Sequence, residues 1–398
     1  MKQKIIYFLK NTLLINMTVF LILAPFSKKL VKISLLVALG FWLLLVIVEF
    51  GSNFHRHLIV KISIKKPLIF FGLAIFLSTI FSLEPYYSHA VLLERFLGYI
   101  LFFFIGNYLV RYKRNLDILI GGIILAGIFM GVGGMWDHFH LRSPRLFTSF
   151  GHIISLSDFM TLYIPFCFII VLFSKTKILK AGSVICSIFL FPCLLLNATR
   201  AAWVAVAGSL LIVSFFKNRK IAFCLLIVFI ISGFFLPLAL QQRAMTTVNP
   251  LTWGERLPLW KISLEIFADF PVFGAGLGMY EKLLAQYWEP SSLSPQLPHW
   301  NTHNNYLQVV SESGIVGLIA FTWIFIAFFK HAFAVLNKTS GEQQVILMGL
   351  TGSVIAALIF AMSASNITSG VQEVAVFWFM FGMACGLTSV IENKVVAV

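Results

Sequence analysis

The sequence predicts an all-α polytopic membrane protein with about twelve transmembrane helices, and two observations carry this prediction. The chain is 59% hydrophobic and only 11% charged, less than half the charge density of an ordinary soluble domain. Apolar runs of about 20 residues recur along its whole length, and each could cross a ~30 Å hydrocarbon core as a helix. The runs do not alternate apolar and polar residues, as the strands of a transmembrane barrel would.

Twelve segments fit this description, and we expect the first to be a retained helix because it lacks a small-x-small cleavage site. The segment 201–216 is short, so we expect it to be tilted or extended at its ends. All five cysteines fall in apolar segments without a CxxC pair, which favours small buried residues over a disulfide or a metal site. The predicted spans are residues 5–26, 30–50, 67–83, 91–110, 116–136, 152–173, 177–197, 201–216, 221–240, 306–329, 343–364 and 373–391.

The net charge of +15 reflects topology rather than nucleic-acid binding, because the lysines and arginines stand in short clusters between apolar segments. With a cytoplasmic N-terminus, most of the 30 basic residues fall in inner loops, as the positive-inside rule requires. Lys28, Lys29 and Lys32 run against the rule. This orientation predicts that the loop 241–305 is extracytoplasmic.

The loop 241–305 is the only long stretch of mixed polar, aromatic and charged residues in the chain. Nucleotide-activated donors are absent outside the inner membrane, so an enzyme acting there needs a donor that carries its own activation, such as a lipid-linked diphosphate. The sequence has no Walker motif, no GxGxxG after a strand and no repeated half. We therefore expect one integral membrane domain, 1–398, with much of its active site in this loop.

His303 is the first candidate for chemistry, because it precedes the apolar run that starts at Tyr306. We expect it to open that helix with Asn301 or Thr302 as the N-cap. The positive end of the helix dipole disfavours a charged imidazole and so keeps a neutral ring available as a base. The alternative is a histidine that only makes hydrogen bonds at the interface. His299 is expected to shape the loop.

Outer-side arginines are the candidates for binding a diphosphate, because a guanidinium grips phosphate oxygens with a planar fork. Arg200 follows Asn197-Ala-Thr between two apolar runs, and the alternative role there is snorkelling. Arg256 begins a pattern typical of an amphipathic helix that includes Trp260, with pairing to Glu255 or lipid headgroups as its alternative role. Arg142 and Arg145 are further outer cations.

The tract from Pro271 to Gly278 contains three glycines, which could let backbone N–H groups approach an anion. A metal site is not predicted, because acidic residues are few and the outer ones form no DxD pattern. Glu312 is expected to face the bundle interior or to pair with a neighbour on its helix, without a catalytic role.

The stretch Thr302-His-Asn-Asn-Tyr-Leu-Gln-Val-Val-Ser-Glu-Ser-Gly-Ile-Val-Gly317 resembles the signature of the bacterial O-antigen ligase family, whose core is shared with O-antigen polymerases. Arg256-x-x-x-Trp260 followed by Pro271-x-x-Gly274-x-Gly276 matches in kind, as do Arg145-Leu-Phe-Thr-Ser-Phe-Gly-His152 and Thr199-Arg200-Ala-Ala-Trp203. The similarity covers roughly residues 140–330.

This resemblance implies a metal-independent, cofactor-free glycosyltransferase of the GT-C type in the bacterial inner membrane, with a long periplasmic loop. It implies transfer of a polysaccharide from undecaprenyl diphosphate to a sugar hydroxyl of lipid A–core, with inversion. Its implied site residues are His303 as the base, Arg200, Arg256 and Arg145 around the diphosphate, and Asn304, Trp260 and Gly276 in support.

Three alternatives remain open from the sequence. An O-antigen polymerase and a protein O-oligosaccharyltransferase can present the same outer histidine and arginines. A transporter of lipid-linked sugars belongs to a different class and would be expected to place ionisable residues along a path through its spans. The spans here are nearly free of charge, which favours an enzyme.

Overall fold

A computed structural model describes residues 1–50, 64–141, 153–245, 256–288, 301–368, 370 and 372–396, and within these residues all regular structure is helical. Ten of the described helical segments are long and apolar enough to cross a membrane. The other two predicted spans coincide with helices of 16 and 17 residues. Each of the twelve predicted segments therefore corresponds to a helix, and ten have the length of a span.

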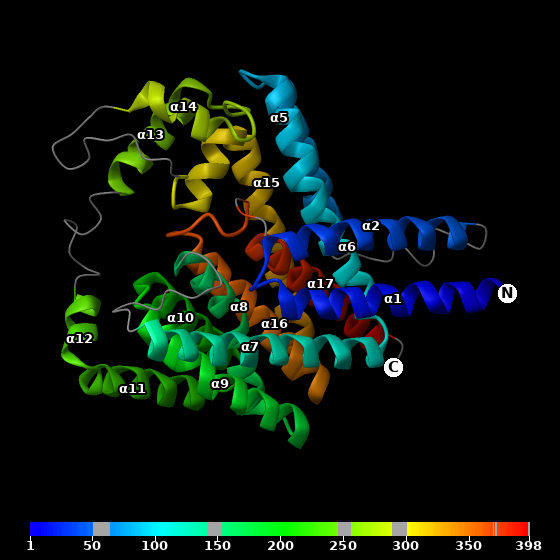
Figure 1. The fold of residues 1–398 in the computed structure, drawn as a ribbon, viewed down its shortest axis with the longest axis vertical. Coiled ribbons are helices and arrows are strands. Elements are labelled where there is room, and N and C mark those ends of the chain that lie inside the picture. The colour runs from blue at the N-terminus through cyan, green and yellow to red at the C-terminus, as the bar shows by residue number, and fades with distance from the viewer. Residues whose placement is uncertain are drawn as a thin grey trace.

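The helices follow one another in the order shown by the colours of Figure 1. They are α1 (Lys2–Leu23), α2 (Lys28–Phe50), α4 (Lys65–Ile80), α5 (Pro85–Val91), the π-helical turn η1 (Leu92–Phe96), α6 (Leu97–Leu109), α7 (Lys113–Leu141), α8 (Ile153–Phe173), α9 (Lys177–Asn197), α10 (Arg200–Lys217), α11 (Arg219–Phe235), α12 (Leu238–Met245), α13 (Arg256–Asp269), α14 (Met279–Tyr287), α15 (Asn305–Leu336), α16 (Glu342–Phe360) and α17 (Gln372–Val396).

Helix α16 lies at the centre of the bundle and runs antiparallel to α8 and α10. Ser174 at the end of α8 donates from Oγ to Glu342 Oε1 at the start of α16, 2.5 Å away. Lys217 at the end of α10 donates to Gln344 Oε1 at 2.6 Å. Because these ends meet, the starts of α8 and α10 lie beside the end of α16. We call this end of the bundle the site end.

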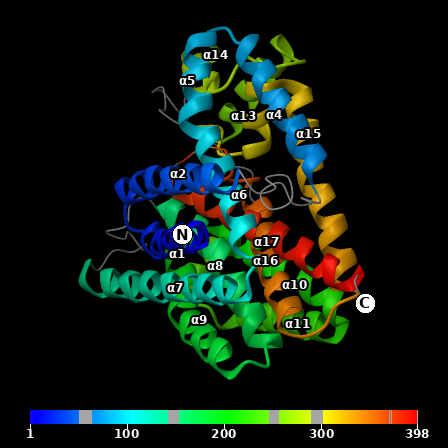
Figure 2. The ribbon, with the colours of Figure 1, turned by 90° about the vertical axis from the view of Figure 1, so that its right-hand side faces the viewer.

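Helix α15 also begins at the site end and finishes beside the start of α16. Gln344 Nε2 donates to Leu336 O at 2.8 Å where the two helices turn, and Asn305 N donates to Ala361 O at 2.8 Å at the opposite end. Helix α4 packs along the far side of α15, where the rings of Phe71 and Phe321 are 5.8 Å apart. Figures 1 and 2 both show α5, α13 and α14 gathered around the beginning of α15.

Helix α15 is broken at Gly314, whose φ of 64° and ψ of −168° are not helical. The loop 271–278 between α13 and α14 crosses this break. Ala275 N donates to Ser311 O, and Ile315 N donates to Pro271 O, at 3.0 and 2.9 Å. The loop therefore pairs with backbone groups that a continuous helix would have paired internally, which an apolar surrounding requires.

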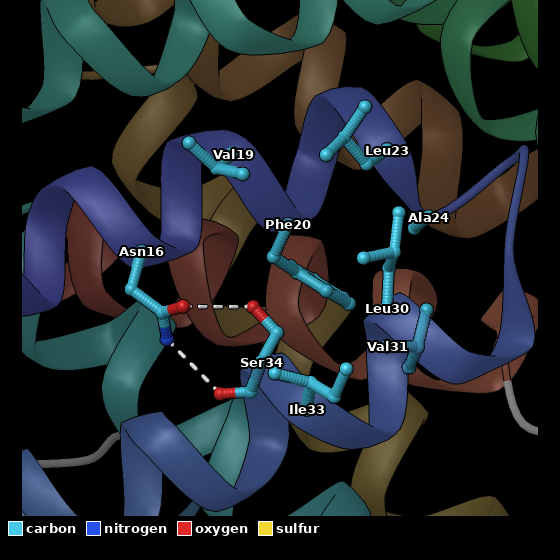
Figure 3. Close-up of a pocket in the computed structure, with 9 residues that line it drawn as sticks. All are labelled: Asn16, Val19, Phe20, Leu23, Ala24, Leu30, Val31, Ile33 and Ser34. Carbon is cyan, nitrogen blue, oxygen red and sulfur yellow. Dashed lines mark hydrogen bonds between the residues drawn. The ribbon is translucent and has the colours of Figure 1, made fainter.

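A pocket of about 100 Å³ lies between α1 and α2, and Figure 3 shows its lining. Asn16 Nδ2 donates to Ser34 O at 3.0 Å, and Ser34 Oγ donates to Asn16 Oδ1 at 2.9 Å. The rest of the lining is apolar and includes Phe20 and Leu23. The pocket lies in the first hairpin, and its two polar side chains bond to each other. None of the candidate site residues lines it.

Replacing Gly314 with Ala should lower the melting temperature of the purified protein in detergent. A Cβ at this position would lie 2.2 Å from Val272 O, in a backbone conformation that disfavours side chains. The left-handed backbone alone costs on the order of 1–3 kcal/mol, and the contact with the loop adds to that. The matched control is Gly121→Ala in α7, where the added Cβ meets nothing within 4 Å and alanine favours the helix. Equal melting temperatures for the two variants would contradict this account of the kink.

Candidate functional site

The turn that precedes α15 is fixed by a series of side-chain caps. Asn304 is the N-cap, and its Oδ1 accepts from Tyr306 N and Leu307 N at 3.0 and 3.1 Å. Thr302 Oγ1 in turn accepts from Asn304 N at 3.1 Å and donates to Asn304 O at 2.6 Å. The expectation that Asn301 or Thr302 caps this helix is therefore wrong. The stronger cap lies next to the helix because an asparagine oxygen there reaches two of the orphan N–H groups.

His303 lies one residue outside the helix, where it does not open α15 as expected. Its φ is 48°, in the left-handed region, and its N–H donates to Asn301 Oδ1 at 3.1 Å. Positive φ is uncommon for a residue other than glycine, although histidine is among the more tolerant. A residue held in this way by its neighbours is a recurrent feature of functional sites. The half-buried side chain remains beside the positive end of the helix dipole.

Helix α13 presents Arg256 and Trp260 toward this turn. The two residues are four apart, so they lie on one face of the helix. Trp260 Nε1 donates to Thr302 O at 3.1 Å, and Arg256 Nη1 makes a hydrogen bond to Ser363 Oγ. The helix predicted for this segment is confirmed, and Leu259 and Ile266 are buried in it.

The residues between α16 and α17 form the part of the site that the sequence analysis missed. We call residues 361–368 the connector. Its Ser363 binds Arg256, and Ser365 Oγ is 3.5 Å from Thr302 Oγ1. Asn305 Oδ1 accepts from Ile367 N and from Thr368 N and Oγ1 at 3.1–3.2 Å. The signal in the sequence was the short polar run Ser363-Ala-Ser-Asn-Ile-Thr368 between the last two apolar spans.

Arg200 begins α10 on a neighbouring helix at the same end of the bundle. The chain turns sharply into α10 through Ala198, whose φ is 55°. Ser157 Oγ and Thr199 Oγ1 both donate to the buried Asn197 Oδ1, at 2.8 and 2.5 Å, which ties this turn to the start of α8. The structure thus joins Arg256, Trp260 and the His303 turn by hydrogen bonds, and it places Arg200 at the site end on a separate helix.

The glycine tract is used for packing against α15. Gly274 N donates to Phe270 O, Ala275 N to Ser311 O and Gly276 N to Glu312 O, at 3.0–3.1 Å. These three N–H groups are therefore already satisfied by the protein, and they do not form the anion cradle that was expected. A Cβ on Gly276 would lie 2.0 Å from Ser82 Oγ, so glycine is required there by close packing.

Arg145 lies outside the described residues, together with Arg142, Glu255 and His299. Its proposed role at the diphosphate remains a prediction. In the described part of the chain, no three His, Cys, Asp or Glu side chains come together as a metal site would require. Independence from metal ions also remains a prediction.

Helices α13 and α14 form one small unit above the start of α15. They share an apolar cluster that includes Leu259, Ile266 and Leu283. Tyr280 OH donates to Leu259 O at 3.0 Å across the unit, and burial raises the pKa of Tyr280, so its hydroxyl stays protonated as a donor. Lys282 pairs with Glu84 and lies 3.9 Å from the centre of the Tyr87 ring, which attaches the unit to α5.

The fold and this cluster define a multi-pass α-helical membrane protein whose candidate catalytic groups gather at one end of the bundle. Residues 184–322 match the family model described as O-antigen ligase. The match runs from α9 into α15 and contains Arg200, Arg256, Trp260 and His303. The resemblance seen in the sequence is confirmed over this segment, and the match supports a function of the O-antigen ligase or polymerase type in general. No curated protein matches the chain.

Replacing Asn304 with Ala should destabilise the start of α15, because two N–H groups lose their acceptor. The loss of an N-cap costs about 1 kcal/mol, and we expect faster hydrogen–deuterium exchange at Tyr306 and Leu307. Asn304→Asp keeps an acceptor in the same place and serves as the control, with exchange close to wild type. Equal exchange in the alanine and aspartate variants would contradict the assignment of this cap.

Proposed function

We propose that this protein transfers O-antigen polysaccharide from undecaprenyl diphosphate to a sugar hydroxyl of lipid A–core at the periplasmic face of the bacterial inner membrane. The observation that carries the proposal is the hydrogen-bonded cluster of Arg256, Trp260, the His303 turn and the connector. This cluster includes three predicted site residues inside the segment that matches the O-antigen ligase family. The orientation of the chain in the membrane rests on the distribution of its basic residues.

His303 would act as the base on the acceptor. An acceptor hydroxyl attacks the anomeric carbon of the donor, the bond from that carbon to the diphosphate oxygen breaks, and the hydroxyl proton passes to the imidazole. The electron pair of the broken bond leaves with the diphosphate, and the configuration at carbon inverts. A neutral ring is required for this step, and a position beside the positive end of a helix dipole favours the neutral form.

Arg256 and Arg200 would bind the diphosphate and stabilise the charge that develops on it. A lipid diphosphate needs little protonation to leave, so charge stabilisation matters more than a general acid. Arg256 is held by Ser363 on one side of α13, and Trp260 fixes the same face of that helix against Thr302. These contacts pre-orient one guanidinium beside the turn that carries the base. Arg145 is proposed as a third diphosphate ligand.

His303→Ala should abolish ligation without preventing polymer synthesis. General-base catalysis contributes roughly 10²–10⁴-fold, so lipopolysaccharide ladders should show unsubstituted core together with lipid-linked polymer. The control is His331→Ala in the second half of α15, at matched expression. Full-length polymer still attached to core in His303→Ala would contradict the catalytic assignment.

The same ladders separate the ligase from the polymerase. A strain that lacks a polymerase retains single repeat units on its core, whereas a strain that lacks a ligase has core without any unit. Cores that carry single units in the His303→Ala strain would favour the polymerase over our proposal.

Arg256→Lys should lower the rate of transfer by roughly tenfold or more, because charge-assisted hydrogen bonds contribute about 1.5–3 kcal/mol and lysine cannot provide the planar fork. The measurement is glycosyl transfer by purified protein with a synthetic diphosphate donor. Lys261→Arg, an exposed change one helical turn along α13, is the control and should leave the rate unchanged. Near-normal transfer by Arg256→Lys would argue against bidentate contact with the diphosphate.

A further inference from the structure

We infer that Glu312 is a positioning residue that fixes the His303 turn relative to the helix that carries Arg256. This inference rests on the function proposed above. It concerns a residue for which the sequence analysis expected burial or pairing on its own helix and no part in the reaction. It follows from the contacts of one buried carboxylate at the break in α15.

Glu312 cannot itself touch the reacting groups. It lies nine residues along the chain from His303, which corresponds to roughly 14 Å of helix rise. Its side chain is inside the protein, with 8% of the residue exposed. A buried carboxylate is costly unless hydrogen bonds or charges compensate it. The chain therefore retains an expensive group at a distance from the chemistry, and its contacts indicate what it does there.

The first contact is to the short rod that supports the candidate base. Between the Asn304 cap and the break at Gly314, α15 forms a segment of about two and a half turns. Gln308, in the middle of this segment, donates from Nε2 to Glu312 Oε1 at 3.3 Å. Asn305, one turn earlier, holds Thr368 of the connector. Asn305, Gln308 and Glu312 follow one another along one face of the segment and link both of its ends to other elements.

The second contact is to the unit that carries Arg256. Gly276 N donates to Glu312 O at 3.0 Å, and the backbone N–H of Gly278 faces the Glu312 carboxylate. Gly278 ends the loop 271–278 and caps α14. Helix α14 is attached to α13 by the Tyr280 hydroxyl, which donates to Leu259 O. Because Leu259 is in the first turn of α13, this path reaches the same turn as Arg256.

The third contact is electrostatic and comes from a separate part of the chain. The guanidinium of Arg95 acts on the Glu312 carboxylate. Arg95 stands in η1, a π-helical turn, and such turns occur frequently at functional sites. Glu312 O also accepts from Ser78 Oγ of α4 at 2.7 Å. Glu312 thus connects three parts of the protein. They are the short helical segment that follows His303, the unit of α13 and α14 that carries Arg256, and the neighbouring elements α4 and η1.

The geometry assigns to Glu312 the role of setting the distance between the candidate base, His303, and the candidate diphosphate ligand, Arg256. The backbone hydrogen bonds between the loop 271–278 and α15 fix the height of the rod, and the Glu312 carboxylate lies between Gln308 of the rod and Gly278 of the unit that carries Arg256. Small errors in such a separation reduce the rate of reaction more than they reduce binding, because only the reacting geometry depends on it.

The test compares Glu312→Gln with wild type in two independent measurements. An amide oxygen keeps the acceptor but loses the charge, so the variant should fold. We expect faster hydrogen–deuterium exchange in peptides that cover 301–313 and 271–279, and unchanged exchange in 342–360. In the transfer assay we expect kcat to fall roughly tenfold or more, since hydrogen bonds to charged groups contribute about 1.5–3 kcal/mol, with KM within about threefold of wild type. Glu312→Ala should change both measurements further in the same direction.

Glu265→Gln is the matched control, because Glu265 forms an exposed ion pair with Lys261 on α13 at 3.4 Å, and such pairs contribute little. Wild-type exchange and wild-type kcat in Glu312→Gln would overturn the inference, as would an equal loss in Glu265→Gln. Exchange that rises throughout the bundle in Glu312→Gln would also overturn it, because the residue would then support the whole fold. Hydrogen–deuterium exchange does not depend on the reaction catalysed. Retained ligation in His303→Ala would therefore reject the proposed function, whereas the exchange in Glu312→Gln decides whether Glu312 holds the two segments.

Discussion

The structure depends on the backbone hydrogen bonds between the loop 271–278 and the interrupted helix α15. A helix that breaks inside an apolar surrounding leaves peptide groups without partners, and each unpaired group is costly. The loop supplies those partners from Pro271 and Ala275, and glycines on both sides allow the two backbones to approach. The same hydrogen bonds seat α13 and α14 over the start of α15. The break in α15 and the position of α13 and α14 therefore depend on the same hydrogen bonds.

The antiparallel arrangement around α16 explains why distant segments meet at one end. Glu342 and Gln344 at the start of α16 bind the ends of α8 and α10, so the opposite ends of these helices are level with the connector. Residues near positions 200, 303 and 363 lie at the same end of the bundle for this reason, although more than 160 residues separate the first from the last. Neither a sheet nor a separate soluble domain is needed for this convergence.

The sequence predicted the helices well because the hydropathy of a span is a property of the segment alone. It predicted Arg256 and His303 for one site because both lie in the one long polar loop of an apolar chain, and the family resemblance added Trp260. It could not predict the Asn304 cap, since several residues before Tyr306 are competent caps and only packing selects one. It also assigned the glycine tract to an anion, because a glycine required by a close helix and a glycine required by a ligand look alike. The connector was overlooked because serines in a membrane protein also occur between packed helices.

The connector has a further consequence for how proteins of this kind diverge. The segment that matches the O-antigen ligase family ends at residue 322, whereas Ser363 and Ser365, which contact the arginine helix and the histidine turn, lie beyond it. One side of the candidate site thus belongs to a segment outside the part of the chain that matches the family. Two relatives with identical cores can differ in this segment. A hybrid that joins the core of one to the last two helices of another would combine the histidine and arginines of the first with the connector of the second.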